Sequence, residues 1–280
     1  MRFDRWLLRF RTCLPRHHTV RGLPAGMVCL VLGIWLLGFY SFASAKEYDG
    51  IWFLGFNVQK PPFDNLKVRQ AVNHALEKDF ISSEIMSNGV APISSIPPGM
   101  PGYDSELKPY KLNVKFAKTL MKRAKYSPND QRLKELTLLH TDGIKTVEIA
   151  KKIQKDLKQI GMKINLVQVS YRGEESWIRE LSSRKHHLFL MGYKTESEQL
   201  FTEEASAKAA DSYHLLEPLF KTKGEANFTG YSNSTVDMLL DQVSVIGPSF
   251  LKERELKLKE INKILYKELP VLVLFYIEKL

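Results

Sequence analysis

The middle of the sequence constrains the fold most, because three consecutive patterns there define a strand, a helix and a second strand. Residues 136–140 and 162–169 are apolar runs of strand length, and residues 144–160 repeat apolar side chains at helical spacing. Gly161 supplies a left-handed stop at the end of the helix. Parallel strands need such a crossover, and its right-handed form is nearly obligatory. The sequence therefore predicts an α/β fold built around a βαβ unit.

The apolar segments on either side extend this unit into a mixed sheet flanked by helices. Further strands are expected at 51–57, 188–193 and 271–276. Helices are expected after Asp64 as a cap, after Asn113 as a cap, around Trp177, after a capping box of Ser234 and Asp237, and over 251–269. Prolines and glycines exclude regular structure between residues 88 and 104.

Residues 22–45 contain no charged side chain and are framed by Arg21 and Lys46. At about 1.5 Å per residue, a helix over this span would cross a hydrocarbon core of ~30 Å. The span ends in the small residues 43–45, which suit signal peptidase, so a signal peptide is favoured and an uncleaved membrane anchor is the alternative. Residues 1–45 are thus expected to be a signal or transmembrane helix. Residues 46–280 are expected to be periplasmic or otherwise extracytoplasmic, and the anchor alternative would tether them to the inner membrane.

The positive charge of the chain is concentrated in this N-terminal segment. The formal net charge is +10, and residues 1–45 hold six Arg against one Asp, which leaves +5 for residues 46–280. A charge of +5 over a body of this size is modest unless it gathers in one place. We therefore predict no nucleic-acid partner.

The body of the chain lacks the residue patterns of catalytic and metal sites. Cys13 and Cys29 both lie in residues 1–45, so no disulfide or cysteine-based metal site is available beyond them. No GxSxG, GxGxxG, P-loop or HExxH pattern occurs. His186 and His187 are neighbours at the start of a predicted strand, where they point to opposite faces and cannot share an ion. The sequence predicts a protein that is not an enzyme and needs no metal or cofactor.

An acidic stretch follows the predicted strand that ends at Tyr193. Residues 193–217 carry two bases, Lys194 and Lys208, against six acids: Glu196, Glu198, Glu203, Glu204, Asp211 and Glu217. Ligands of open α/β sheets bind where loops leave the carboxyl ends of strands. A carboxylate there could pair with the ammonium group of a ligand. The alternative is a solvated acidic loop.

Several short segments, in order along the chain, resemble one known family. They are FLGFN at 53–57, KPPFD at 60–64, VRQAV at 68–72, IPPGMPGYD at 96–104, LLEPLF at 215–220, GYSN at 230–233 and LPV at 269–271. Together they are similar to the peptide-binding (family 5) solute-binding proteins of ABC importers. The resemblance implies a periplasmic-binding-protein-like lobe. It also implies a receptor that closes two α/β lobes around a peptide and delivers it to a membrane permease.

The matching segments correspond to the second lobe of that family. The resemblance therefore implies that residues 46–280 are a single lobe, either a truncated product or half of a split receptor. Its expected partners are an oligopeptide or similar small solute, ABC permease subunits and a separate first lobe. One lobe offers half a pocket and no hinge closure.

The resemblance also suggests which residues contact the ligand. Tyr193 stands where relatives have a tryptophan, and Asp211 matches the later acid of a turn whose aspartate is associated with the peptide amino group. We therefore expect the ligand contacts to be Tyr193, Glu196, Asp211 and Tyr213.

Two other functions remain open from the sequence. The first is a membrane-tethered interaction module that docks on a permease or envelope protein without carrying solute. The second is an envelope enzyme on the same scaffold, which would need a nucleophile or metal cluster that the sequence does not display.

Overall fold

A computed structural model describes residues 46–87, 92–171, 174–195, 211–247 and 250–279. The predicted signal or anchor segment at 1–45 and the predicted ligand contact Glu196 lie outside these residues. In the part of the chain that is described, no helix combines the length and the apolar character that crossing a bilayer requires.

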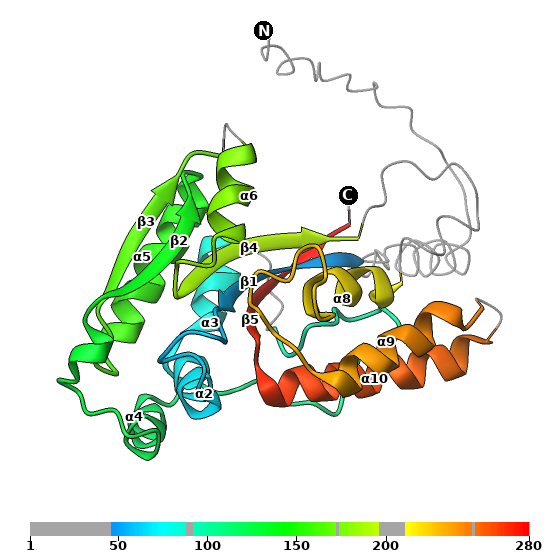
Figure 1. The fold of residues 1–280 in the computed structure, drawn as a ribbon, viewed down its shortest axis with the longest axis horizontal. Coiled ribbons are helices and arrows are strands. Elements are labelled where there is room, and N and C mark those ends of the chain that lie inside the picture. The colour runs from blue at the N-terminus through cyan, green and yellow to red at the C-terminus, as the bar shows by residue number, and fades with distance from the viewer. Residues whose placement is uncertain (1–45, 88–91, 172–173, 196–210, 248–249, 280) are drawn as a thin grey trace, which may run out of the picture. The chain divides into compact units, whose positions relative to one another are not determined.

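Five strands and the helices around them make up the described unit (Figure 1). The strands are β1 (Tyr48–Phe56), β2 (Leu136–Thr141), β3 (Ile164–Val169), β4 (Leu188–Lys194) and β5 (Val271–Glu278). The helices are α2 (Leu66–Ala75), α3 (Lys78–Phe80), α4 (Val114–Arg123), α5 (Ile144–Lys158), α6 (Glu174–Ser182), α8 (Ser212–Phe220), α9 (Ser234–Val245) and α10 (Leu251–Glu268). A π-helical turn (Ile81–Ile85) follows α3, and a 3-10 turn (Gln131–Leu133) precedes β2.

The five strands form one mixed sheet in the order β3-β2-β4-β1-β5. β2 is parallel to both β3 and β4, whereas β1 is antiparallel to both β4 and β5. This confirms the predicted mixed sheet and its βαβ unit. β1 begins three residues before the predicted strand at 51–57, because Tyr48 pairs with Glu278 at the far end of the sequence.

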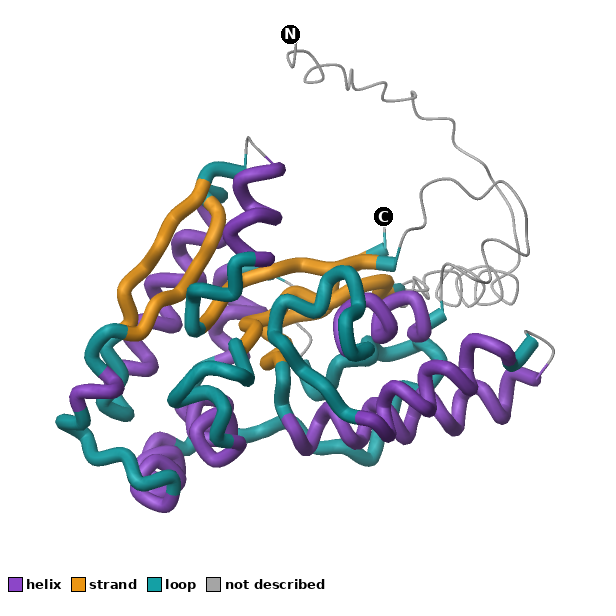
Figure 2. Tube along the Cα trace, in the orientation of Figure 1, coloured by secondary structure: helices purple, strands orange, loops and turns teal. Residues whose placement is uncertain are grey.

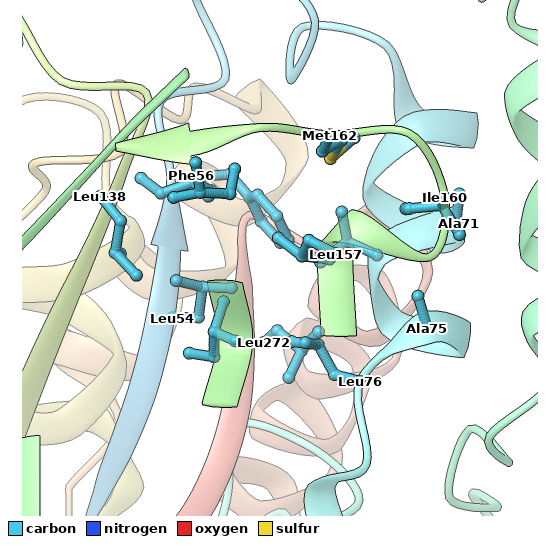
Figure 3. Packing of buried hydrophobic residues seen from close by; sticks show 14 of the residues in the cluster. Leu54, Phe56, Ala71, Ala75, Leu76, Leu138, Leu157, Ile160, Met162 and Leu272 are labelled. Carbon is cyan, nitrogen blue, oxygen red and sulfur yellow. The ribbon is translucent and has the colours of Figure 1, made fainter. Parts of the chain in front are cut away.

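Each face of the sheet is buried under its own hydrophobic core, and Figure 2 shows helices on either side of the strands. Alternation along β1 sends Leu54 and Phe56 to one core and Ile51 and Phe53 to the other. The first core includes α2, α4 and α5, and Figure 3 shows Leu157, Ile160 and Met162 packed there with strand residues. The second core includes α6, α8, α9 and α10.

Gly161 closes α5 as predicted, and the structure gives two reasons for glycine there. Its φ of +90° lies in the left-handed region, which side chains disfavour. A Cβ atom at this position would lie 2.8 Å from the carbonyl oxygen of Pro128. The glycine therefore lets the loop after α4 rest on the end of α5.

Two of the three predicted helix caps are wrong by one residue. Asn65, not Asp64, caps α2 by accepting a hydrogen bond from Lys67 N at 3.0 Å. Asn233, not Ser234, caps α9, and Asp237 accepts from Thr222 N at 2.8 Å instead of closing a capping box. In both cases an asparagine one residue away has the extended backbone that a cap needs. The Asn113 cap on α4 is confirmed.

The proline-rich connection contains no helix or strand over residues 92–104, as predicted. Buried Asp104 anchors its end to α10 through Lys259 at 3.2 Å and Lys263 at 3.5 Å. Burial opposes ionisation of Asp104, but the Glu106 N–H and the two lysines outweigh it and hold the pKa of this carboxyl below its usual value.

Candidate functional site

One end of the sheet gathers the residues that the acidic stretch led us to expect. β4 ends there, β5 ends there and β1 begins there, because β1 runs antiparallel to both neighbours (Figure 1). Gly50 lies opposite Lys194, and Tyr48 lies opposite Glu278. We call this end, with the residues Tyr48, Asp49, Tyr193, Lys194, Thr195 and Glu278, the carboxyl edge.

Asp49 is the most unusual group at the carboxyl edge. It is 3% exposed, and neither of its carboxylate oxygens accepts a hydrogen bond from a described residue. Its only ion pair in the described part of the chain is with Lys194, whose Nζ lies 3.3 Å from Oδ2. Buried carboxylates normally accept several hydrogen bonds, since leaving a buried acceptor unsatisfied costs roughly 1–3 kcal/mol. The carboxylate of Asp49 can therefore still accept hydrogen bonds from a ligand.

The backbone around Asp49 is held firmly. Thr195 donates its N–H to the Asp49 carbonyl oxygen at 2.9 Å and its hydroxyl at 3.2 Å. The neighbouring Tyr48 hydroxyl is also buried without a hydrogen-bond partner, while its ring packs against Tyr276 with centroids 5.7 Å apart. Two adjacent polar side chains in this strand thus lack hydrogen-bond partners within the described residues.

Asp211, a predicted ligand contact, has a structural role at the start of α8. Its Oδ1 accepts from Tyr213 N at 3.0 Å and caps the helix. Its Oδ2 pairs with Arg254 Nε at 2.5 Å. Arg254 also donates to the carbonyl oxygens of Val243 and Ile246, so this ion pair joins the start of α8 to the end of α9 and to α10.

Tyr193 and Tyr213, the other described ligand predictions, pack against the same hydrophobic core. Both are half-buried, and the guanidinium of Arg254 lies 5.4 Å from the centre of the Tyr213 ring. Burial, reinforced by Glu217, raises the pKa of Tyr213. The structure thus brings Tyr193, Asp211 and Tyr213 to one side of the sheet, and Glu196 lies outside the described residues.

Sequence reasoning missed Asp49, Tyr48 and Arg254. Asp49 lies within an apolar strand and not in the acidic stretch, and Arg254 is one charged residue among many in α10. A charged residue beside the apolar run 51–56 was the available signal for Asp49. Nothing in the local sequence marked Arg254.

The two adjacent histidines lie in a bend before β4 and not in the strand where they were expected, and they have separate partners. His186 Nε2 lies 3.1 Å from Glu180 Oε2, and His187 Nδ1 lies 3.1 Å from Thr137 Oγ1. Burial, together with Lys60 and His186, lowers the pKa of His187 to about 4. Over the described residues, no three His, Cys, Asp or Glu side chains come together as metal ligands would.

The family can now be stated from the sequence as well as the fold. The sequence model of the bacterial extracellular solute-binding proteins, family 5 Middle, matches residues 38–201, which are 164 of the 280 residues. The chain belongs to this family. The family is one of solute-binding proteins, so the predicted resemblance and the predicted non-enzymatic class are confirmed.

Curated relatives of this family 5 chain bind different solutes. It is 28% identical over 161 residues to the dipeptide-binding protein of Escherichia coli, covering 51% of this chain and 26% of the relative. It is 26% identical over 223 residues to heme-binding protein A of Haemophilus influenzae, covering 78% of this chain and 38% of the relative. It is 25% identical over 232 residues to the glutathione-binding protein GsiB of Salmonella typhimurium, covering 81% and 42%.

Solved structures show the same fold. HbpA2 from Haemophilus parasuis superposes with a TM-score of 0.71 at 21% identity, covering 84% of this chain and 43% of that one. The murein tripeptide binding protein MppA of Escherichia coli gives a TM-score of 0.70 at 18% identity, covering 89% and 46%. DppA from Helicobacter pylori, in complex with the peptide STSA, gives 0.69 at 24% identity, covering 84% and 44%. The chain thus spans less than half the length of each of these relatives.

Proposed function

We propose that this family 5 chain supplies one wall of an extracytoplasmic site for short peptides, which it passes to an ABC permease. The observation that carries the proposal is the Asp49 carboxylate, which is buried without a hydrogen bond beside Lys194. Dipeptides, glutathione and the murein tripeptide, named for three of the relatives, are short peptides. Short peptides carry an ammonium group and a carboxylate. At the carboxyl edge, Asp49 could pair with the first and Lys194 with the second.

The proposed recognition step is an exchange of ion pairs. The Lys194 side chain is 38% exposed, so it is free to swing out when a peptide ammonium takes its place at Asp49. The released lysine ammonium then pairs with a carboxylate of the peptide. Such charge-assisted contacts fix the direction of the peptide as well as holding it.

Tyr193 and Tyr213 complete the proposed wall with aromatic surface, and Glu196 and Asp211 are the other proposed carboxylates. Asp211 already caps α8 and pairs with Arg254, so its share in binding the ammonium group is expected to be smaller than that of Asp49. The second wall corresponds to the part of the longer relatives that this chain does not match. We propose that a separate first lobe provides it.

The test is a thermal-shift and calorimetry series on the full chain with trialanine, N-acetyl-trialanine and trialanine amide. Free trialanine should stabilise the chain, because a ligand that binds only the folded state adds RT ln(1 + [L]/Kd) to its stability. Acetylation should remove the effect. Asp49→Asn should likewise abolish the stabilisation by free trialanine. Asp211→Asn, Glu196→Gln and Lys194→Gln measure how much each of the other proposed contacts contributes to binding.

If no peptide stabilises the folded chain or gives a heat of binding, the proposal of peptide capture is rejected. That result would favour the interaction module, in which the chain docks on a permease or envelope protein without cargo. Equal stabilisation by free and acetylated trialanine would support peptide binding but contradict the proposed pairing of Asp49 with the peptide ammonium group.

A further inference from the structure

A second feature lies at the opposite end of the sheet from the carboxyl edge. A groove of about 1010 Å³ opens where β3 begins and where α5 ends. Its walls come from α4, from the loop after α4, from the last turn of α5 and from residues 160–165. Because β2, β3 and β4 are parallel, this amino end of the sheet is remote from the end of β4.

The groove is lined by six lysines and by no Asp or Glu. We call them the groove lysines: Lys118, Lys122, Lys134, Lys155, Lys158 and Lys163. All are exposed except Lys134, which is half-buried. Residues 46–280 carry a net charge of only +5, so a lining of six cations without an anion is a marked concentration of that charge.

None of the groove lysines forms an ion pair within the described part of the chain. The same helix shows the contrast. Lys152, on α5, pairs with Glu77 and with Asp156 at 2.7 Å each. Like charges that gather without counter-charges repel one another, and that cost is relieved when an anion enters.

We infer that this groove binds a multivalent phosphate-bearing anion. Lysine ammonium groups are compact point charges that suit phosphate oxygens and need no fixed fork geometry. Six of them around one groove match several phosphates better than a single carboxylate. The volume is close to that of ordinary small-ligand sites, at about 300–1,000 Å³.

Polar and apolar side chains between the lysines agree with a discrete ligand site. Gln154, Gln159 and Asn165 lie among the cations, and Gln154 Nε2 already donates to the Ile164 carbonyl oxygen at 2.7 Å. The floor is the closed apolar core, where Met121 and Met162 are almost fully buried. The anion would therefore bind along the lysine rim and not within the core.

The experiment is isothermal titration of the full chain, in neutral detergent, with tripolyphosphate and with orthophosphate. Tripolyphosphate should bind, and orthophosphate should bind more weakly by about tenfold or more, since fewer charges contact the lysines. Added salt should weaken tripolyphosphate binding steeply. The double substitution Lys155→Glu with Lys158→Glu should weaken it by about tenfold or more.

The matched control is Lys252→Glu with Lys267→Glu. Both are exposed lysines of α10 outside the groove, and neither has an ion pair in the described chain, so the net charge changes equally. The control should change tripolyphosphate affinity by less than about twofold, because the added charges are distant and screened.

An equal loss in both double variants would overturn the inference, because net charge alone would then explain binding. Binding of orthophosphate as tight as that of tripolyphosphate would overturn the multivalent ligand. Failure of tripolyphosphate to bind the folded chain would overturn the site. None of these outcomes depends on peptide binding at the carboxyl edge.

Discussion

The two ends of the sheet handle charge in opposite ways. At the carboxyl edge, cations and anions occur in pairs: Lys46 with Glu278, Lys279 with Glu47 at 3.4 Å, and Lys194 with Asp49 at 3.3 Å. At the amino end, the groove lysines have no counter-charge among the described residues. The difference teaches that net charge is a poor guide to electrostatic function, because pairing in space decides where a ligand charge is needed.

The largest expected effect on stability concerns Lys78, a buried lysine that can be compared with the exposed groove lysines. Lys78 is 8% exposed and has no carboxylate partner in the described chain, although its Nζ donates to Asn73 Oδ1 at 2.7 Å. Burial lowers the pKa of Lys78 to about 8. The groove lysines differ from Lys78 because solvent reaches them.

The pH dependence of unfolding tests this difference. Between about pH 8 and 10.5 the unfolded state keeps the Lys78 proton that the folded state has lost, so stability rises with pH. Relative to Lys78→Met, the wild-type chain should gain about 2–3 kcal/mol of unfolding free energy across this range. Denaturant unfolding at several pH values measures the gain. Parallel pH curves for the two proteins would show that Lys78 does not titrate there.

The next largest effect is expected from a substitution at Gly161, which lines the groove of the lysines. Gly161→Ala forces a side chain into the left-handed region and against Pro128, so the unfolding free energy should fall by about 2 kcal/mol. Gly247→Ala is the matched control, since a Cβ there meets nothing within 4 Å. If the variant folds, it should also weaken tripolyphosphate binding. Equal stability of the two variants in urea unfolding would contradict the tight contact at Gly161.

The smallest effects compare a largely buried ion pair with an exposed one. Asp211→Ala removes a cap and the partner of Arg254, and should cost about 1–2 kcal/mol. Lys279→Gln removes an ion pair whose side chains are 43% and 74% exposed, and should change stability by less than about 0.5 kcal/mol. Thermal and denaturant unfolding measure both. If Asp211→Ala lowers the unfolding free energy no more than Lys279→Gln does, the structural role of Asp211 is contradicted.

The sequence alone determined the five strands, most of the longer helices and the family, but it did not predict α8. Strand and helix periods predicted the βαβ unit and every strand of the described sheet, and short ordered motifs indicated family 5. The sequence did not locate two of the helix caps, because a cap requires an extended backbone at one particular residue. The structure gives that conformation to Asn65 and Asn233.

Only the tertiary structure decided where charges meet. It placed β1 between β4 and β5, which brought Asp49 beside Lys194, and it assembled the groove from residues as far apart as Lys118 and Lys163. Periodicity reports which face of an element is buried, but not which distant element lies against it. Electrostatic energy depends on distance in space, so the sequence carries the charges without the pairing that gives them a function.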